Sequence, residues 1–417
     1  MKNYKERVIE EQIRRKLHSS GGILLRGPRY VGKTTTALRH SKSSIRLDAS
    51  PEVQWQAETA PLSILRGNTP RLIDEWQLAP NLWNVARSVI DHRNQRGQFI
   101  FTGSAIPDNN ITTHTGAGRF SRLYMRPMSL YEKGISTSEI PFSCIFEDDF
   151  FAGGLGGLTV EEYFKEIIKG GWPALLELNE THALESLIDY VDNIANVDLQ
   201  QVKSPPNPER ITALMRSLSR NISTEVSYEK LSAEALIGNG PISVQSVRKY
   251  LDQLTSICIL EKLPAWRTHI RSNINIRIKP KWHFIDPSLA TATLRLSSKS
   301  LLHDLNAAGL FFESLAIRDL RIYAGTMGAK VFHYRDATSL EIDAIVERYD
   351  EKWIAFEVKI GGEKHIEAAI SDFAKLKNRL TDEKLKQCAG FVVLTAGRNS
   401  YTRKDGVHII SLGHLCP

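Results

Sequence analysis

Apolar and polar positions alternate along the first part of the chain in a way that predicts strands separated by helices. Short apolar runs typical of buried strands occur at residues 23–25, 44–48, 71–75 and 98–104, with a fifth near 119–126. Helical spacing of apolar residues lies between them, for example over 82–92. Strands alternating with helices predict a largely parallel sheet covered on both faces. We therefore expect an α/β domain over residues 1–155.

The pattern changes after the glycines at 153–157. Residues 159–202 have helical spacing and end at the proline-rich stretch 204–208. Three helical signals and a strand follow over 209–266, which is the pattern of a winged helix. We expect residues 156–267 to form a helical lid and this winged helix.

The third of these helical signals, residues 243–254, carries polar residues suited to nucleic acid. Ser243 would cap the helix, and the exposed set would be Gln245, Ser246, Arg248, Lys249 and Gln253. Winged helices also bind proteins, and two basic residues on the helix do not decide between the two uses.

Residues 268–417 begin a new core. Strands are predicted at 282–286, 341–346, 353–359, 391–395 and 407–411, with a helix over 310–323. The polar turn 349–352 would join two of the strands as a hairpin. The chain thus has three predicted domains, the third again of α/β type.

Residues 22–36 form the motif that organises the chain, because a short apolar strand enters the loop GxxxxGKT and a helix follows. This is a phosphate-binding loop: its glycines let backbone N–H groups face phosphate oxygens, Lys33 faces the β- and γ-phosphates, and the Thr34 hydroxyl binds Mg²⁺. The predicted nucleotide-binding residues are Gly27, Pro28, Arg29, Gly32, Lys33, Thr34, Thr35 and, from the next motif, Asp74.

The strand at 71–75 ends in two acids. Asp74 would hold Mg²⁺ through a water molecule, and Glu75 would orient and polarise the water that attacks the γ-phosphate. A strand cap or a solvated turn is the alternative, and the phosphate loop favours the catalytic interpretation.

Two further positions could face the γ-phosphate. Thr102 and Ser104 end the strand at 98–104, although an ordinary Thr-Gly-Ser turn explains them almost as well. Arg119 could be supplied to the γ-phosphate of a neighbouring subunit, and a surface arginine is the alternative.

Carboxylates and a lysine gather on the predicted hairpin of the third domain. Residues two apart in a strand share a face, so Glu341 lies beside Asp343, and Glu357 beside Lys359. Metal-dependent phosphodiester hydrolysis needs such a set, with Asp343 and Glu357 as Mg²⁺ ligands and Lys359 orienting water. Glu313 on the preceding helix would complete the ligands. Two strands with charged outer faces are the alternative.

Composition bounds the partners and the compartment. The chain has 417 residues, a formal net charge of +7 and four widely spaced cysteines. The mild basic charge permits DNA as a partner, and the cysteine spacing predicts neither a zinc site nor a disulfide framework. With no signal peptide or membrane-spanning run, we expect a cytoplasmic protein without membrane contact.

The ordered motifs resemble one prokaryotic family: Gly-Pro-Arg-Tyr-Val-Gly-Lys-Thr-Thr, Leu-Ile-Asp-Glu, Phe-Thr-Gly-Ser, Gly-Arg, then Glu-Ile-Asp and Glu-Val-Lys. The chain is similar to the largely uncharacterised AAA-type ATPases that carry a winged helix and a restriction-endonuclease-like C-terminal domain of the PD-(D/E)xK pattern. The resemblance implies ATP and Mg²⁺ at the residues that match Lys33, Thr34, Asp74 and Glu75. It also implies that Arg119, in the Gly-Arg motif, contacts a γ-phosphate.

Two functions therefore remain open from the sequence. One is an ATP-hydrolysing protein acting on DNA, whose nucleotide state controls a metal-dependent nuclease domain. The other is an ATP-dependent switch whose C-terminal domain binds nucleic acid or protein without cleavage. A homo-oligomer would follow if Arg119 acts between subunits.

Overall fold

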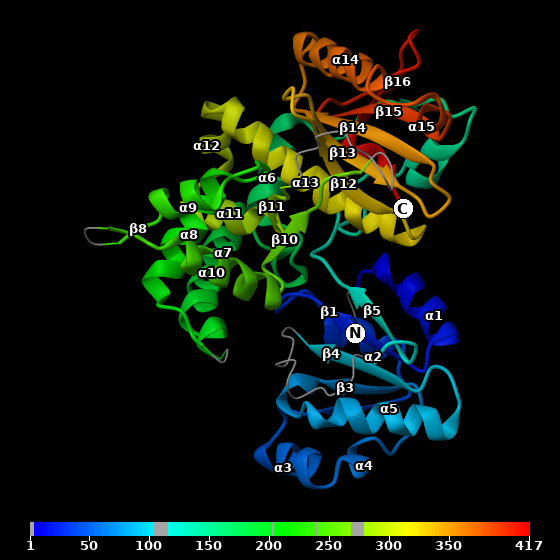
Figure 1. Ribbon diagram of the computed structural model, residues 1–417, viewed down its shortest axis with the longest axis vertical. Helices are drawn as coiled ribbons and strands as arrows, with labels where there is room; N and C mark the ends of the chain where they lie inside the picture. The colour runs from blue at the N-terminus through cyan, green and yellow to red at the C-terminus, as the bar shows by residue number, and fades with distance from the viewer. Residues whose placement is uncertain (1–3, 104–115, 202–203, 238–239, 268–278) are drawn as a thin grey trace. The chain divides into compact units, whose positions relative to one another are not determined.

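The computed structural model describes residues 4–103, 116–201, 204–237, 240–267 and 279–417. The chain divides into two compact units (Figure 1). Unit 1 contains the chain up to Arg126 with the short segments 201–205 and 252–259. Unit 2 contains residues 127–200, 206–251 and 260–417.

Unit 1 is built on a five-stranded sheet in which every pairing is parallel, as predicted. The strand order is β2-β3-β4-β1-β5. The strands are β1 (Gly22–Arg26), β2 (Ser43–Arg46), β3 (Arg71–Asp74), β4 (Phe99–Gly103) and β5 (Phe120–Tyr124).

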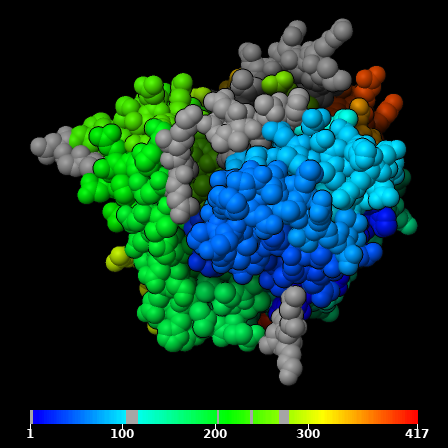
Figure 2. All heavy atoms as spheres, turned by 90° about the horizontal axis from the view of Figure 1, so that it is seen from below, coloured from blue at the N-terminus to red at the C-terminus, as the bar shows by residue number. Residues whose placement is uncertain are grey.

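Alternating strand residues feed two separate cores, one on each face of this sheet. Leu24, Ile73, Phe99 and Phe101 pack with apolar residues of α3 (Pro51–Thr59), α4 (Pro61–Ile64) and α5 (Asn81–Arg93). Ile23, Leu25, Leu72 and Ile100 pack on the other face with α1 (Ile9–Ser19) and α2 (Lys33–Arg39). Helices α3 and α4 form part of the outer surface of this unit (Figure 2, blue).

Unit 2 contains a mixed seven-stranded sheet of order β12-β13-β14-β15-β17-β16-β7. Strands β13 (Glu341–Glu347) and β14 (Trp353–Lys359) pair antiparallel through the predicted turn. The other strands are β12 (Lys330–Arg335), β15 (Cys388–Thr395), β16 (Ser400–Thr402), β17 (His408–Ser411) and β7 (Gly153–Gly154).

Helices cover both faces of this sheet (Figure 1). Ala369, Phe373 and Leu376 of α14 (Glu363–Lys377) pack on one face against Trp353 and other strand residues. On the other face, Phe356 stacks on Phe142, which also contacts Tyr323 of α13 (Leu305–Thr326). A short helix α15 (Asp382–Lys386) precedes β15.

Helices occur where helical segments were predicted before residue 254, namely α6 (Val160–Lys169), α7 (Glu180–Asn196), α8 (Pro208–Arg220) and α9 (Tyr228–Glu234). Two further helices of unit 2, α11 (Pro287–Leu294) and α12 (Ser298–His303), were not predicted. Helix α10 (Val244–Ser256), whose residues from Asp252 onward belong to unit 1, has the predicted cap, since Ser246 N–H donates to Ser243 Oγ at 3.1 Å. Strands β8 (Leu236–Ile237) and β9 (Gly240–Pro241) pair before it.

Two segments differ from the prediction in where they pair. The strand predicted at 282–286 exists as β11 (Lys281–Phe284), but it pairs with β10 (Leu260–Leu263) and not with the C-terminal sheet. Gly153–Gly154, predicted as a loop closing the first domain, is instead an edge strand paired with β16. Residues 127–155, predicted to belong to the first domain, lie in unit 2, because the first segment of unit 1 ends at Arg126.

A further strand pair in unit 2 joins segments that are far apart in the sequence. Strand β6 (Ile140–Pro141) pairs with β18 (Leu415–Cys416), which lies at the end of the chain. All four cysteines are free thiols. Within the described ranges, no helix combines the length and apolarity needed to span a bilayer.

Candidate functional site

The phosphate loop lies between β1 and α2 and depends on its two glycines. Gly32 has φ 96° and Tyr30 has φ 63°, so the backbone turns twice through the left-handed region before α2 begins. At Gly27 an added Cβ would lie 2.3 Å from the carbonyl oxygen of Met125. Glycine is needed at Gly27 because of this close approach, and at Gly32 because of its φ.

Lys33 lies inside the loop. Its Nζ donates to the carbonyl oxygens of Gly27 at 3.1 Å and Pro28 at 2.8 Å, and the residue is 6% exposed. Burial lowers the pKa of Lys33, and the nearby Glu75 carboxylate opposes that shift. The ammonium is thus held by two backbone carbonyl oxygens at the start of the loop. Of the other predicted loop residues, Arg29 is partly exposed and Thr35 lies exposed on α2.

Thr34 and Asp74 are brought together from distant parts of the sequence. Thr34 Oγ1 lies 3.0 and 2.9 Å from the two carboxylate oxygens of Asp74. Asp74 ends β3, is buried, and also accepts a hydrogen bond from Thr102 Oγ1 at the end of β4. The two residues predicted to contact Mg²⁺, Thr34 and Asp74, are therefore adjacent. The Asp74 carboxylate lies between the hydroxyls of Thr34 and Thr102 and is held by both.

Glu75 follows β3 in a left-handed conformation with φ 54°. The side-chain amide of Gln77 donates to its carboxylate, which holds the carboxylate in one orientation. Arg46 on β2 is a neighbour that the sequence analysis missed, with Nε 3.9 Å from Asp74 Oδ2. Ser104, the other candidate at the end of β4, lies outside the described residues.

Arg119 and the phosphate loop lie at opposite ends of the parallel strands. Arg119 precedes β5, whose residue Phe120 pairs with Gly22 at the start of β1, whereas the loop follows the other end of β1. The five residues of β1 separate the two ends of the strand by roughly 15 Å. Arg119 Nε instead contacts Asp91 of α5 at 2.7 Å. Within one unit 1, Arg119 is therefore not placed beside its own phosphate loop.

A second cluster of charges forms on the β13–β14 hairpin of unit 2. Lys359 Nζ lies 3.1 Å from Asp343 Oδ2 and 2.6 Å from Glu357 Oε2. The backbone N–H of Val358 also donates to Asp343 at 2.8 Å. The structure thus brings together the acid pair and the lysine that strand periodicity placed on one edge.

Lys281 of β11 enters the same cluster and was not predicted from the sequence. Its Nζ lies 2.9 Å from Glu313 Oε1, 2.6 Å from Glu341 Oε1 and 3.9 Å from Asp343 Oδ1. Its side chain is 1% exposed. The predicted ligand Glu313 therefore faces an ammonium group supplied by another strand.

The environment separates the protonation of these carboxyls. Burial raises the pKa of Glu313 to about 8, against the opposing effect of Lys281. Burial and the neighbouring Asp343 raise the pKa of Glu357 well above its usual range. Burial also acts to raise the pKa of Asp343, but Lys359 and Lys281 outweigh it and the pKa lies below its usual value. Asp343 thus carries the most stable negative charge of these three carboxyls.

The fit of this cluster to a divalent cation is incomplete. Glu357 Oε1 is buried with no hydrogen-bond partner among the described residues, which suits an additional cation. However, the part of the chain that the structure describes contains no group of three or more His, Cys, Asp or Glu side chains with metal-binding geometry. The carboxylate oxygens that would form it already contact Lys281 and Lys359.

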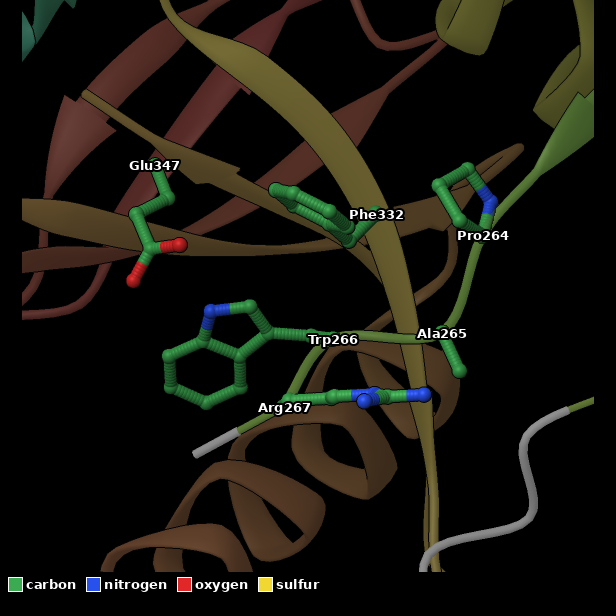
Figure 3. Close-up of a pocket in the computed structure, with 6 residues that line it drawn as sticks. All are labelled: Pro264, Ala265, Trp266, Arg267, Phe332 and Glu347. Carbon is green, nitrogen blue, oxygen red and sulfur yellow. The ribbon is translucent and has the colours of Figure 1, made fainter. Parts of the chain in front are cut away.

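A cavity of about 360 Å³ lies elsewhere in unit 2. It is lined by Pro264, Ala265, Trp266, Arg267, Phe332 and Glu347, and Figure 3 shows the two aromatic rings and the Glu347 carboxylate around it. None of these described residues belongs to the predicted sites.

Comparison with protein-family models gives a match for the part of the chain that contains the first site. Residues 19–133 match the model of an AAA domain. This part of the chain is similar to an AAA domain. The match contains the phosphate loop, Asp74, Glu75 and Arg119, and it ends seven residues after Arg126, the last residue of the first segment of unit 1.

The remainder of the chain matches two domains of unknown function. One model, DUF8612, covers residues 160–300, and the other, DUF4143, covers residues 308–415. The first match includes β11, in agreement with the pairing of β11 with β10.

Curated proteins and solved structures that are similar to this chain share a low sequence identity with it. Uncharacterized proteins of Mycobacterium bovis and Mycobacterium tuberculosis are each 23% identical over 353 residues, covering 84% of this chain and 72% of theirs. A Walker-type ATPase of Pyrococcus abyssi has 13% identity and a TM-score of 0.42, with 71% of this chain and 97% of that chain covered. The Orc1 protein of Aeropyrum pernix in complex with DNA has 11% identity and a TM-score of 0.28, with coverages of 73% and 94%.

Proposed function

We propose that this AAA domain protein is an ATP-dependent molecular switch that binds ATP with Mg²⁺ and hydrolyses it. The observation that carries the proposal is the contact between Thr34 and Asp74, because it joins the hydroxyl and the carboxylate that would share one Mg²⁺. Oxygen donors of this kind suit that ion, which would neutralise charge on the β- and γ-phosphates.

Different residues would then bind the phosphates, position Asp74 and accept the proton. Loop N–H groups and Lys33 bind the phosphates, and Thr102 holds Asp74 in place through its hydroxyl. Glu75, oriented by Gln77, accepts a proton from the attacking water. Arg119 lies away from this site, which suits an arginine supplied to a neighbouring subunit.

Titration with fluorescent ATP in the presence of Mg²⁺ tests the nucleotide site. Wild type should bind, and Lys33→Ala should bind much more weakly because the buried ammonium is lost. The matched control is Lys42→Ala, a lysine of the same unit that lies outside the phosphate loop. Equal binding by wild type and Lys33→Ala would overturn the proposal.

For the C-terminal domain, the geometry supports binding without cleavage. Lys281 and Lys359 together supply two positive charges to the carboxylates that a metal-dependent nuclease would use. As they lie, these carboxylates contact two ammonium groups, so their fit to a divalent cation is incomplete. The switch would instead use this domain as a contact module for nucleic acid or protein.

Metal-dependent cleavage of DNA is the second candidate. The convergence of Asp343, Glu357 and Lys359, together with the unpartnered Oε1 of Glu357, favours it. Incubation of the full chain with plasmid and Mg²⁺ or Mn²⁺, with and without ATP, separates the candidates. Nicking or linearisation that is lost in Asp343→Ala would establish the second candidate, and intact plasmid supports the first.

DNA contact by helix α10 belongs to the same proposal. Gln245, Arg248 and Lys249 are exposed on this helix, and Arg248 lies over the Tyr228 ring at 5.3 Å. Gln253 differs from the prediction, since it is partly buried and donates to the Ser204 carbonyl at 2.8 Å. If the exposed residues contact phosphates, Lys249→Ala should weaken binding to duplex DNA and reduce its dependence on salt concentration.

A further inference from the structure

The phosphate loop contains a peptide that needs support. Val31 lies between Tyr30 and Gly32, which both have positive φ. For Tyr30 this conformation is unfavourable, and such residues persist only where their surroundings hold them. The Val31 side chain is fully buried in the core with α1 and α2, which anchors one side of the peptide.

Arg7 holds the other side of that peptide. Its Nη1 donates to the carbonyl oxygen of Val31 at 2.8 Å, and Arg7 is only 4% exposed. A carbonyl oxygen held by a guanidinium cannot turn toward the anion that the loop is built to bind. Arg7 therefore fixes the orientation of the peptide that leads into Gly32 and Lys33.

The same guanidinium reaches the residue at which the chain leaves unit 1. Arg7 Nη2 donates to the carbonyl oxygen of Arg126 at 2.6 Å. The adjacent Met125 also touches the loop, because its N–H donates to Arg26 at 2.7 Å and its carbonyl leaves no room for a side chain at Gly27. The loop and residues 125–126 are thus joined on two sides.

A buried carboxylate positions Arg7 itself. Glu10 Oε1 accepts from the backbone N–H of Arg7 at 3.0 Å and from the Tyr4 hydroxyl at 2.7 Å. Its other oxygen contacts His40 at 2.9 Å, just after the helix that follows the phosphate loop. The N-terminal segment is therefore attached to both ends of the nucleotide-binding element.

We propose that Arg7 is a positioning residue that sets the phosphate loop and couples it to Arg126, where the chain passes to unit 2. The inference rests on the proposed ATP-binding function, since it says which residue shapes that site. A change in the loop peptide on nucleotide binding would then reach residues 125–128 through the shared guanidinium.

Arg7→Gln and Arg7→Lys test this, with Arg14→Gln as the matched control on the exposed face of α1. Losing hydrogen bonds made by a charged group should weaken ATP binding about tenfold or more for Arg7→Gln. Arg7→Lys keeps the charge but not the forked donors, so we expect only partial recovery. Arg14→Gln should bind like wild type, and thermal unfolding without nucleotide shows that each variant is folded.

Hydrogen exchange supplies a readout that a merely structural role would not change. In wild type, ATP should slow exchange in peptides covering residues 27–34 and also in those covering 124–131. In Arg7→Lys the second response should disappear while the first remains. An unchanged affinity together with an unchanged response at 124–131 would overturn the inference, whereas failure of wild type to bind ATP would instead refute the proposed function.

Discussion

Lys281 and Glu313 form an ion pair of 2.9 Å in which the lysine is almost completely buried. The pair joins β11, which belongs to the small sheet with β10, to α13 beneath the C-terminal sheet. Glu341 and Asp343 share the same ammonium. One side chain therefore links the helical part of unit 2 to the acidic cluster on its hairpin.

Removing this ammonium should be costly. Lys281→Met removes the ammonium from the buried side chains of Glu313 and Asp343, and breaking a buried pair of this kind typically destabilises a protein by about 3–5 kcal/mol. Urea unfolding of the full chain measures the change. Lys330→Met, at an exposed position on β12, is the control and should change stability by less than about 0.5 kcal/mol. A Lys281→Met variant as stable as this control would contradict the assigned role.

The same substitution predicts a change in metal binding. Wild type should show no Mn²⁺ binding to the acidic cluster in calorimetry, because Lys281 and Lys359 already neutralise it. Lys281→Ala should gain a binding event, since closely spaced carboxylates then need another cation. The gain should be lost in Lys281→Ala combined with Asp343→Ala. Mn²⁺ binding by wild type that Asp343→Ala abolishes would favour the nuclease candidate instead.

His333 predicts a stability change with pH. Burial and the nearby Lys281 lower its pKa to about 4 from 6.5, and its Nε2 contacts the Lys279 carbonyl at 3.0 Å. The unfolded chain therefore binds more protons between pH 4 and 6.5, so this contribution to stability is present above pH 6.5 and is lost as pH falls.

The size of that loss is on the order of 3 kcal/mol. The difference in unfolding free energy between wild type and His333→Gln should accordingly shrink as pH is lowered from 7 to 4. Chemical denaturation at several pH values checks this. Parallel pH profiles for the two proteins would show that His333 titrates normally in the folded state.

Arg119 predicts complementation between subunits. Arg119 lies at the start of β5, whereas its own phosphate loop follows the other end of β1. We therefore expect Arg119 to contact the γ-phosphate of ATP bound to a neighbouring subunit. Arg119→Ala and Lys33→Ala should each hydrolyse ATP poorly alone, and a mixture should regain activity, since one subunit binds ATP and the other donates the arginine. Arg122→Ala, an exposed change on β5, is the control. No recovery on mixing would remove Arg119 from catalysis.

The arrangement of the phosphate loop beside Asp74 could be predicted because its signals are local. Glycine spacing, a short apolar strand and Lys33-Thr34 lie within fifteen residues, and parallel pairing of β1, β3 and β4 then brings Asp74 and Thr102 to the same edge. The position of Arg119 could not be predicted from the sequence. It depends on the register in which β5 pairs with β1, which places Arg119 at the start of these strands.

The acidic cluster could be predicted only in part. The hairpin placed Asp343, Glu357 and Lys359 together because strand periodicity and the turn are local. Lys281 could not be anticipated, since its contacts with Glu313 and Glu341 span 32 and 60 residues and depend on β11 pairing with β10. The strand at Gly153–Gly154 could not be predicted either. A pair of glycines gives no local signal for a strand, and this strand forms only by pairing with β16, which is distant in the sequence.

ATP hydrolysis by this protein is tested most directly by steady-state phosphate release from ATP with Mg²⁺ by the full chain. Release is measured for wild type and Glu75→Gln, with ATP binding measured in parallel. Glu75→Gln keeps the shape of the side chain but loses the proton acceptor. We predict that wild type releases phosphate, and that Glu75→Gln binds ATP while its turnover falls about 100-fold or more. No phosphate release by wild type would contradict ATP hydrolysis by this protein, and equal turnover by the two proteins would contradict the role of Glu75 as the proton acceptor.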